Sequence, residues 1–133
     1  MAKWRLTNCG TNRLVVLELE MAIGFWSRLR GWQFRSPPAA GSGLLLAPCA
    51  SIHTCWMRFA LDVVWLDREG IVLAVARGVR PWWFAFAPSG TLAVLEVPVG
   101  EAAQFQSGLR LRLAAQDPSS RDNLPQCLGQ MAC

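Results

Sequence analysis

Apolar and polar residues alternate, or give way to wholly apolar stretches, in several short runs along this chain. Residues 3–7 alternate, with Trp4 and Leu6 on one side, and residues 63–66 are continuously apolar. Both patterns are typical of β-strands that bury one face or two. The expected strands cover residues 3–7, 13–20, 44–47, 62–66, 71–76, 91–97 and 109–113. Most are joined by short turns, which favours antiparallel pairing, because parallel neighbours need a crossover of about a dozen residues or more.

One segment changes its period and predicts a helix. Ala22, Phe25, Trp26 and Leu29 recur at the i, i+3, i+4 and i+7 spacing of an amphipathic helix, which we place at residues 22–31. A short helical turn is also expected within residues 101–106. The expected fold class is therefore α+β with β dominant, a compact antiparallel sandwich or barrel with one helix packed on it near residues 22–31.

One hairpin turn and a polar C-terminal segment complete the expected organisation. Residues 67–70, Asp-Arg-Glu-Gly, suit a type I turn followed by a left-handed residue, and so a hairpin. We expect one globular domain over residues 1–115. After it the chain is polar and interrupted by Pro118 and Pro125, which predicts a mobile tail over residues 116–133.

Composition and charge narrow the class of protein. The chain has 133 residues, of which 53% are hydrophobic and 17% charged, which excludes a disordered chain. No apolar run approaches the roughly 18 residues of a membrane span, and the first residues lack the apolar core of a secretory signal, so we expect a cytoplasmic protein. The net charge is +4, but the basic residues are scattered, so we expect no nucleic-acid partner.

The cysteines invite a metal hypothesis that the spacing does not support. The chain has five cysteines, an odd number, which argues against a disulfide framework in a protein without a secretion signal. Cys49, His53 and Cys55 are three soft ligands close together, but the C-x2-C pair of many structural zinc sites is missing. We therefore expect neither a metal nor another cofactor.

The most concentrated polar chemistry lies just before the apolar run at residues 63–66. It consists of His53, the only histidine of the chain, followed by Arg58 and Asp62. A carboxylate at the start of a buried strand needs a partner for its charge, and Arg58 is the nearest one. Either this pair pins a bend onto the sheet, or it lines a cleft that holds a polar ligand. Glu96 alternates with Leu95 and is expected to face outward, where it would line such a cleft.

Two functions are compatible with these residues. As a base, His53 would need a nucleophile from residues 51–55 and Asp62 to orient its ring. No nucleophile elbow or cysteine-protease signature surrounds it. We therefore favour a non-catalytic binding module whose small polar cleft is formed by His53, Arg58 and Asp62, with Glu96 as a fourth ligand-binding candidate. The alternative is a small hydrolase-like enzyme that uses His53 and Asp62 with a nearby Ser, Thr or Cys.

An aromatic segment follows at residues 82–86. Trp82, Trp83 and Phe84 either cover the core or, if exposed, form a contact surface. We take these three as candidate interface residues for a protein partner.

Several motifs together resemble one prokaryotic family. They are Ser27-Arg-Leu-Arg-Gly-Trp-Gln-Phe, Cys49-Ala-Ser-Ile-His-Thr, Met57-Arg-Phe, Leu61-Asp-Val-Val-Trp-Leu-Asp-Arg-Glu-Gly-Ile-Val-Leu, Val79-Arg-Pro-Trp and Val94-Leu-Glu-Val-Pro-Val-Gly100. In order and spacing they are similar to the domain of unknown function 192 family, over about residues 13–113. The resemblance implies a small, mainly-β, jelly-roll-like sandwich or barrel, and no established activity. The chain departs from the family at Ala60, where relatives usually have proline, and after Gly108, where they tend to have aspartate.

Overall fold

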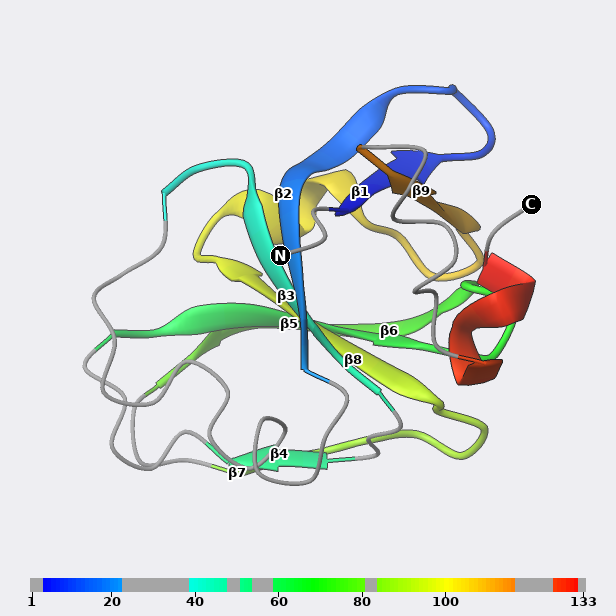
Figure 1. Ribbon diagram of the computed structural model, residues 1–133. Helices are drawn as coiled ribbons and strands as arrows, with labels where there is room; N and C mark the ends of the chain where they lie inside the picture. Colours follow the sequence, from blue (N-terminus) through cyan, green and yellow to red (C-terminus); the bar gives the residue numbers. More distant parts are fainter. Residues whose placement is uncertain are drawn as a thin grey trace.

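The computed structural model describes residues 4–22, 39–47, 51–53, 59–80, 84–116 and 126–131, and this part of the chain is mostly β-structure. The large sheet contains β1 (Trp4–Asn8), β2 (Leu14–Ala22), β3 (Ser42–Leu46), β5 (Leu61–Leu66), β6 (Val72–Val79), β8 (Ala93–Pro98) and β9 (Leu111–Ala115). The small sheet contains β4 (Ser51–His53) and β7 (Phe84–Phe86). Figure 1 shows both sheets. The helices in the described residues are short 3-10 turns, so the expected mainly-β class is confirmed.

The large sheet has seven strands in the order β6-β5-β8-β3-β2-β1-β9. Neighbouring strands pair antiparallel, as expected, except that β2 and β3 are parallel. The segment between these two strands, residues 23–41, is longer than the dozen or so residues that a parallel crossover needs. The expected helix at residues 22–31 falls almost wholly in this segment. Ala22 is the last residue of β2, and residues 23–38 lie outside the described part of the chain.

The sheet curls into a half-barrel whose two edge strands approach each other at one end. Ile71 and Arg110 form an isolated antiparallel bridge there. Beside it, the backbone N–H of Val72 donates to the carbonyl oxygen of Leu109 at 2.8 Å. These contacts pair backbone groups that a free sheet edge would leave unpaired.

The hairpin turn at residues 67–70 has the expected geometry. Asp67 Oδ1 accepts from the backbone N–H groups of Glu69 at 2.8 Å and Ile71 at 3.0 Å. Gly70 has a φ of +82°, in the left-handed region, and a Cβ there would lie 2.5 Å from the Leu111 carbonyl oxygen. Only glycine fits this position, because a side chain would meet both backbone strain and a backbone atom.

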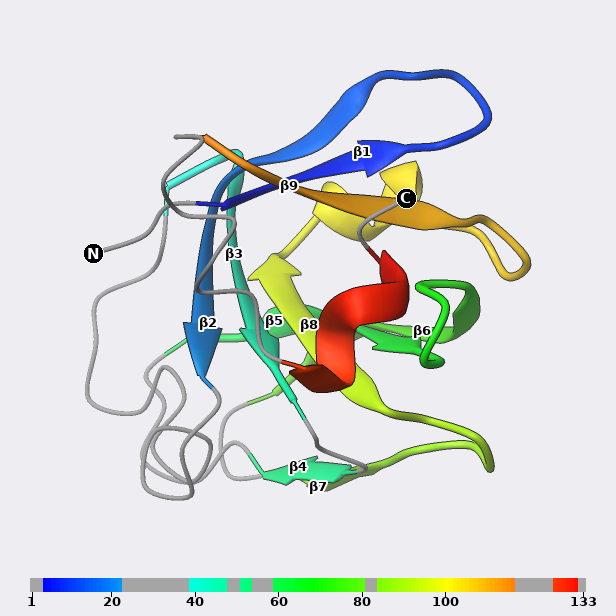
Figure 2. The ribbon, with the colours of Figure 1, turned by 45° about the vertical axis from the view of Figure 1, so that its right-hand side comes forward.

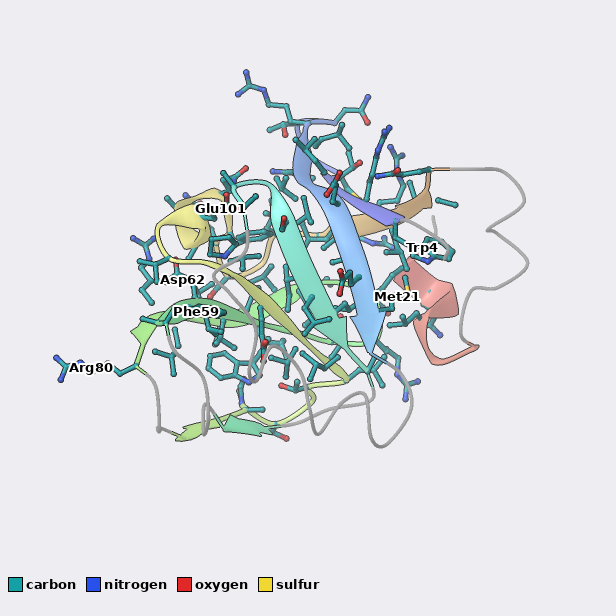
Figure 3. The ribbon with its side chains drawn as sticks, turned by 60° about the vertical axis from the view of Figure 1, so that its left-hand side comes forward. Trp4, Met21, Phe59, Asp62, Arg80 and Glu101 are labelled. Atoms are coloured by element: carbon teal, nitrogen blue, oxygen red, sulfur yellow. The ribbon has the colours of Figure 1, made fainter. Side chains whose placement is uncertain are left out.

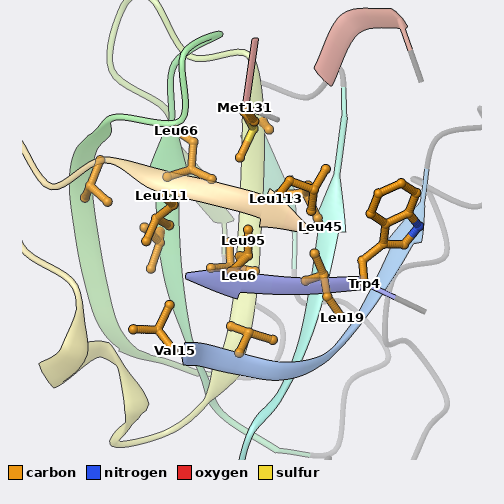
Figure 4. Packing of buried hydrophobic residues seen from close by; sticks show 14 of the residues in the cluster. Trp4, Leu6, Val15, Leu19, Leu45, Leu66, Leu95, Leu111, Leu113 and Met131 are labelled. Atoms are coloured by element: carbon orange, nitrogen blue, oxygen red, sulfur yellow. The ribbon is translucent and has the colours of Figure 1, made fainter. Parts of the chain in front are cut away.

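Two apolar clusters lie on the two faces of the sheet. The inner cluster fills the half-barrel with side chains that include Leu6, Leu45 and Leu95, all fully buried (Figure 4). The second cluster lies on the opposite face of β3, β5, β6 and β8 and consists of Leu44, Leu46, Leu61, Val63, Trp65, Val79 and Val94. Because both faces are covered, the central strands are apolar in continuous runs rather than in alternation.

The second cluster lies on the side of the sheet where the small sheet is found. In Figures 1 and 2, β5 and β8 lie between β1 and β9 on one side and β4 and β7 on the other. Ala87, the residue that follows β7, packs against the second cluster. The small sheet therefore belongs to the layer outside the half-barrel.

Part of the expected C-terminal tail is packed on the domain. Gln126–Met131 forms the 3-10 helix η3, in which Leu128 and Met131 are fully buried in the inner cluster. Residues three apart lie on one face of a 3-10 helix, so both side chains reach the core from the same side. The expectation of a mobile tail therefore does not describe residues 126–131. Within the described residues, no helix is long and apolar enough to cross a membrane.

Candidate functional site

Asp62 lies near the start of β5 and is buried, with 1% of its surface exposed. Its Oδ1 accepts from the backbone N–H of Gly78 at 2.8 Å, and its Oδ2 accepts from those of Gly100 at 2.9 Å and Ala102 at 3.0 Å. Figure 3 shows Asp62 beside the turn that carries Glu101. Three backbone donors surround the carboxylate, which is the usual way to bury such a group without an ion pair.

The donors of Asp62 come from three parts of the fold. Gly78 is in β6, Gly100 follows β8, and Ala102 is in the 3-10 helix η1 (Glu101–Gln104). This helix is the helical turn expected from the sequence, shortened at its end. Asp62 therefore joins β5 to both neighbours of that strand. Its expected partner Arg58 lies outside the described residues.

Glu96 is the second buried carboxyl, and its surroundings differ from those of Asp62. Only 3% of its surface is exposed, and its Oε2 is buried with no hydrogen-bond partner. It lies in β8 opposite Leu44 of β3 and Val63 of β5, both members of the second cluster. Burial raises the pKa of the Glu96 carboxyl from 4.5 to about 8. The carboxyl is therefore largely protonated near neutral pH.

The expected outward exposure of Glu96 is wrong, although the expected face is right. Glu96 does point away from Leu95 and Val97, which lie in the inner cluster. That outer face is itself covered by the second cluster, so a residue on it is buried. Alternation along a strand identifies the face of a side chain but not whether another layer covers it.

Asp62 and Glu96 lie on opposite faces of the sheet. In the β5–β8 register Asp62 pairs with Val97, and Val63 pairs with Glu96. Directly paired residues of an antiparallel sheet share a face, so Asp62 faces the half-barrel and Glu96 faces the outer layer. The structure does not bring these two candidate ligand residues together.

His53 and Phe84 are brought together by the backbone of the small sheet. His53 ends β4 and pairs with Phe84, the first residue of β7. The candidate ligand group and the candidate interface are therefore adjacent in the fold, although they are distant in sequence. The side chains of these two residues, and all of Trp82 and Trp83, lie outside the described part of the structure.

Trp65 is a polar site residue that reasoning from the sequence missed. It lies within the apolar run at residues 63–66, yet its indole Nε1 is buried and has no hydrogen-bond partner. Trp65 pairs with Val94, two residues from Glu96 on the same strand, so Trp65 and Glu96 share the outer face. The N–H of a buried tryptophan usually has a hydrogen-bond partner, so a tryptophan in a strand covered on both faces needs one. Only the register shows which polar group lies near it.

Glu101 is, after Glu96, the second acidic side chain of the described residues with a buried, unpaired oxygen. Its Oε1 accepts from the backbone N–H of Gly41 at 2.7 Å, whereas its Oε2 has no partner. Gly41 precedes β3, so this bond joins η1 to a second part of the sheet. Glu101 thus accepts a backbone hydrogen bond from a distant segment through one oxygen, whereas Asp62 accepts such bonds through both.

Among the described residues, no three His, Cys, Asp or Glu side chains gather in a way that could hold a metal ion. Cys9 is exposed. Cys49 and Cys55, two of the residues that prompted the zinc hypothesis, lie outside the described residues. The expected absence of a metal therefore stays a prediction.

Solved structures share this fold. A protein of unknown function from Novosphingobium aromaticivorans superposes with a TM-score of 0.72 at 21% identity, covering 83% of each chain. A Sinorhizobium meliloti protein, described as a "putative transcription regulator", gives a TM-score of 0.70 at 21% identity, covering 84% of this chain and 92% of its own. At these identities the likeness concerns the fold alone. A search of curated proteins gives no significant match.

Some of the motifs that carry the resemblance lie in the described part of the fold. The hairpin turn at residues 67–70, the carboxyl of Asp62 and the strand that bears Glu96 all lie within them. The sequence profile of the DUF192 family, described as uncharacterized ACR, matches residues 6–113. The chain therefore belongs to the DUF192 family.

Proposed function

We propose that this protein is a non-catalytic binding module that holds a small polar ligand at Glu96, on the outer face of the large sheet. The observation that carries the proposal is the buried Glu96 Oε2, which has no hydrogen-bond partner. Leaving a buried acceptor unpaired costs about 1–3 kcal/mol, and more for a charged group. A ligand that donates a hydrogen bond to Glu96 would remove this cost.

The contrast with Asp62 supports a role in binding rather than in the fold. Asp62 shows how this fold pairs a structural carboxyl, with three backbone donors. Glu96 is equally buried, in the central strand β8, but lies among apolar side chains. Strongly perturbed, poorly paired titratable groups are found most often where a protein binds or reacts.

The other candidate residues take different parts in this proposal. His53 lies in the small sheet, on the side of the large sheet toward which Glu96 points, and is a candidate contact to the ligand. Arg58 is a further candidate contact. Asp62 supports the site indirectly, by holding β5 and β8 in register, and Trp82 and Trp83 are kept as candidates for a protein interface.

The hydrolase-like alternative has no specific support. It needs Asp62 to orient His53, but both oxygens of Asp62 accept from backbone N–H groups. Asp62 also points into the half-barrel, away from the face on which β4 lies. We therefore retain the binding module as the proposed function.

Thermal unfolding in the presence of small probes tests the proposal. Acetamide, methylammonium and ethylene glycol each present hydrogen-bond donors on a small frame. We expect at least one of them to raise the Tm of the wild-type protein, because a ligand that binds only the folded state stabilises it. The same probe should leave the Tm of Glu96→Leu unchanged relative to that variant alone.

Glu69→Gln is the matched control, because Glu69 is an exposed carboxyl in the hairpin turn. It should respond to every probe as the wild type does. Wild-type protein that responds to none of the three probes would contradict the proposed function. So would a response that survives in Glu96→Leu.

A further inference from the structure

Two buried polar atoms without partners lie on one face of the same strand pair. They are Trp65 Nε1 in β5 and Glu96 Oε2 in β8. Trp65 pairs with Val94 and Glu96 pairs with Val63, so Trp65 and Glu96 are diagonal neighbours across the two strands. Diagonal neighbours in an antiparallel pair lie roughly 7–8 Å apart, within reach of long side chains. One small planar group between the two side chains could therefore contact both.

The two atoms are chemically complementary. The indole N–H of Trp65 can only donate, whereas a carboxyl group offers acceptor oxygens and, when protonated, one O–H donor. Burial raises the pKa of Glu96 to about 8, so near neutral pH its carboxyl is largely uncharged. The protonated carboxyl still keeps one oxygen that only accepts. A partner that accepts from the indole N–H and also donates to this carboxyl oxygen therefore pairs more of the buried polar groups than a partner that only accepts.

The surroundings favour an uncharged partner. Leu44 and Val63 flank Glu96 on the two neighbouring strands, and Val94 lies beside Trp65. All three belong to the second apolar cluster. An ionic group placed here would lose its hydration and gain at most one opposite charge, which is costly in an apolar layer.

We propose that Trp65 and Glu96 form a recognition site for a neutral primary amide group. The amide N–H donates to Glu96 Oε2, and the amide oxygen accepts from Trp65 Nε1. This inference rests on the proposed function and names the chemical class of its ligand. An ammonium group would leave the indole N–H unpaired, and a carboxylate would have no proton to donate to Glu96.

The test uses the indole N–H resonances of nitrogen-15-labelled protein, with Trp65→Phe to assign the Trp65 signal. Three probes differ in their hydrogen-bonding groups. Acetamide donates and accepts, N,N-dimethylacetamide only accepts, and the methylammonium cation only donates. We expect acetamide to move the Trp65 signal downfield in a saturable way, because the N–H gains an acceptor. N,N-dimethylacetamide should bind at least about tenfold more weakly, since it has no N–H to donate to the accepting oxygen of Glu96.

Two variants of Glu96 separate an amide site from a cation site. Glu96→Gln keeps a neutral group with a donor and an acceptor, so acetamide affinity should stay within about threefold of the wild type. Glu96→Leu removes both and should weaken acetamide binding at least about tenfold. The Tm and the backbone amide spectrum of each variant establish that it is folded.

Each other outcome overturns the inference in a distinguishable way. If methylammonium binds and Glu96→Gln abolishes its binding, the ligand is a cation, and the proposed function survives without the amide site. If acetamide moves the Trp65 signal equally in Glu96→Leu, both proposals fall. If acetamide does not bind, the amide site falls, and the proposed function falls with it when methylammonium and ethylene glycol also leave the Tm unchanged. If a crystal soaked in acetamide shows only a water molecule between Nε1 and Oε2, the pair is a hydration site and the inference falls.

Discussion

At the scale of single residues, the two buried carboxyls in the described part of the chain, Asp62 and Glu96, have opposite surroundings. Both oxygens of Asp62 are paired, because they accept three backbone hydrogen bonds. Glu96 has an unpaired oxygen in an apolar layer, which favours the protonated form. The same chemical group is therefore part of the scaffold at one position and the centre of a proposed site at the other.

The stability of the fold should depend on pH through Glu96. Its pKa rises from 4.5 to about 8 on folding, so the folded protein binds more protons than the unfolded chain between these values. The free energy of unfolding should then fall as pH rises from about 5 to about 8, by up to about 1.4 kcal/mol per pH unit. The stability that the protonated Glu96 contributes is fully present below the pKa of 4.5 in the unfolded chain. It is lost as the pH rises through the folded pKa of about 8.

Urea unfolding from pH 5 to pH 9 checks this dependence. Glu96→Gln cannot ionise, so its stability should fall less steeply than that of the wild type over the same range. Glu69→Gln, which removes an exposed carboxyl, should follow the wild type. Equal pH dependence in Glu96→Gln and the wild type would show that the carboxyl is not held protonated.

At the scale of elements, Asp62 connects the parts of the sheet around β5. Its side chain binds the backbone of Gly78 in β6 and of Gly100 and Ala102 at the end of β8 and in η1. Gly78 and Gly100 have φ values of +62° and +96°, and neither would meet a neighbouring atom if it carried a Cβ. Their left-handed backbone, rather than a lack of space, is what favours glycine at these two positions.

Asp62→Ala should destabilise the protein by about 3 kcal/mol or more, because it leaves buried N–H donors unpaired. Urea unfolding measures the loss. Asp67→Ala is a suitable control, since Asp67 accepts two backbone N–H groups in a turn that water can reach. The control should lose about 1 kcal/mol, the usual net value of a hydrogen bond whose groups water can reach.

A stable Asp62→Ala variant that no longer binds the probe would assign Asp62 to the ligand instead. That outcome would favour the cleft of His53, Arg58 and Asp62 expected from the sequence. Loss of stability together with retained probe binding would support the role given to Asp62 here.

At the scale of the whole molecule, the half-barrel is completed by segments from the two ends of the described chain. β1 pairs with β9, and η3 adds Leu128 and Met131 to the inner cluster. Met131 also lies near Gly70, where a Cβ would approach its side chain within 3.3 Å. The C-terminal helix is therefore packed beside the hairpin turn that joins β5 and β6.

Removal of residues 117–133 should therefore destabilise the domain. Leu128→Ala and Met131→Ala should each cost about 2–5 kcal/mol, because each leaves a cavity in the inner cluster. Gln130→Ala, at an exposed position of the same helix, should change the stability little. Urea unfolding of the truncated chain and of the three variants, each compared with the wild type, measures these losses. A truncated chain as stable as the full one would support the expectation of a mobile tail.

Much of the fold could be predicted from local patterns. The alternation around Trp4, the hairpin turn at residues 67–70 and the helical turn after Gly100 are all found in the structure. The parallel pairing of β2 and β3 could not be predicted, because it depends on how the chain crosses between them. The burial of Leu128 could not be predicted, because it is an isolated apolar residue in a polar segment that contains Pro118 and Pro125.

The candidate site was predicted only in part. Asp62 was recognised as a buried group in need of partners, but its partners are backbone donors distant in sequence. Glu96 was placed on the right face and given the wrong exposure. Trp65 was read as apolar, because nothing near it in the sequence indicates which polar group lies across the neighbouring strand.

Local patterns in the sequence of this protein predict the strands of its large sheet, its hairpin turn, its family and the face on which Glu96 lies, but not the strands β4 and β7. These follow from interactions within a few positions along the chain, such as the period of two in a strand and the left-handed preference of glycine. Only the tertiary structure decided that the outer face is covered, that Asp62 and Glu96 point apart, and that Glu96 shares its face with Trp65. Register and layering join residues distant in sequence, and these decide which buried polar groups find a partner.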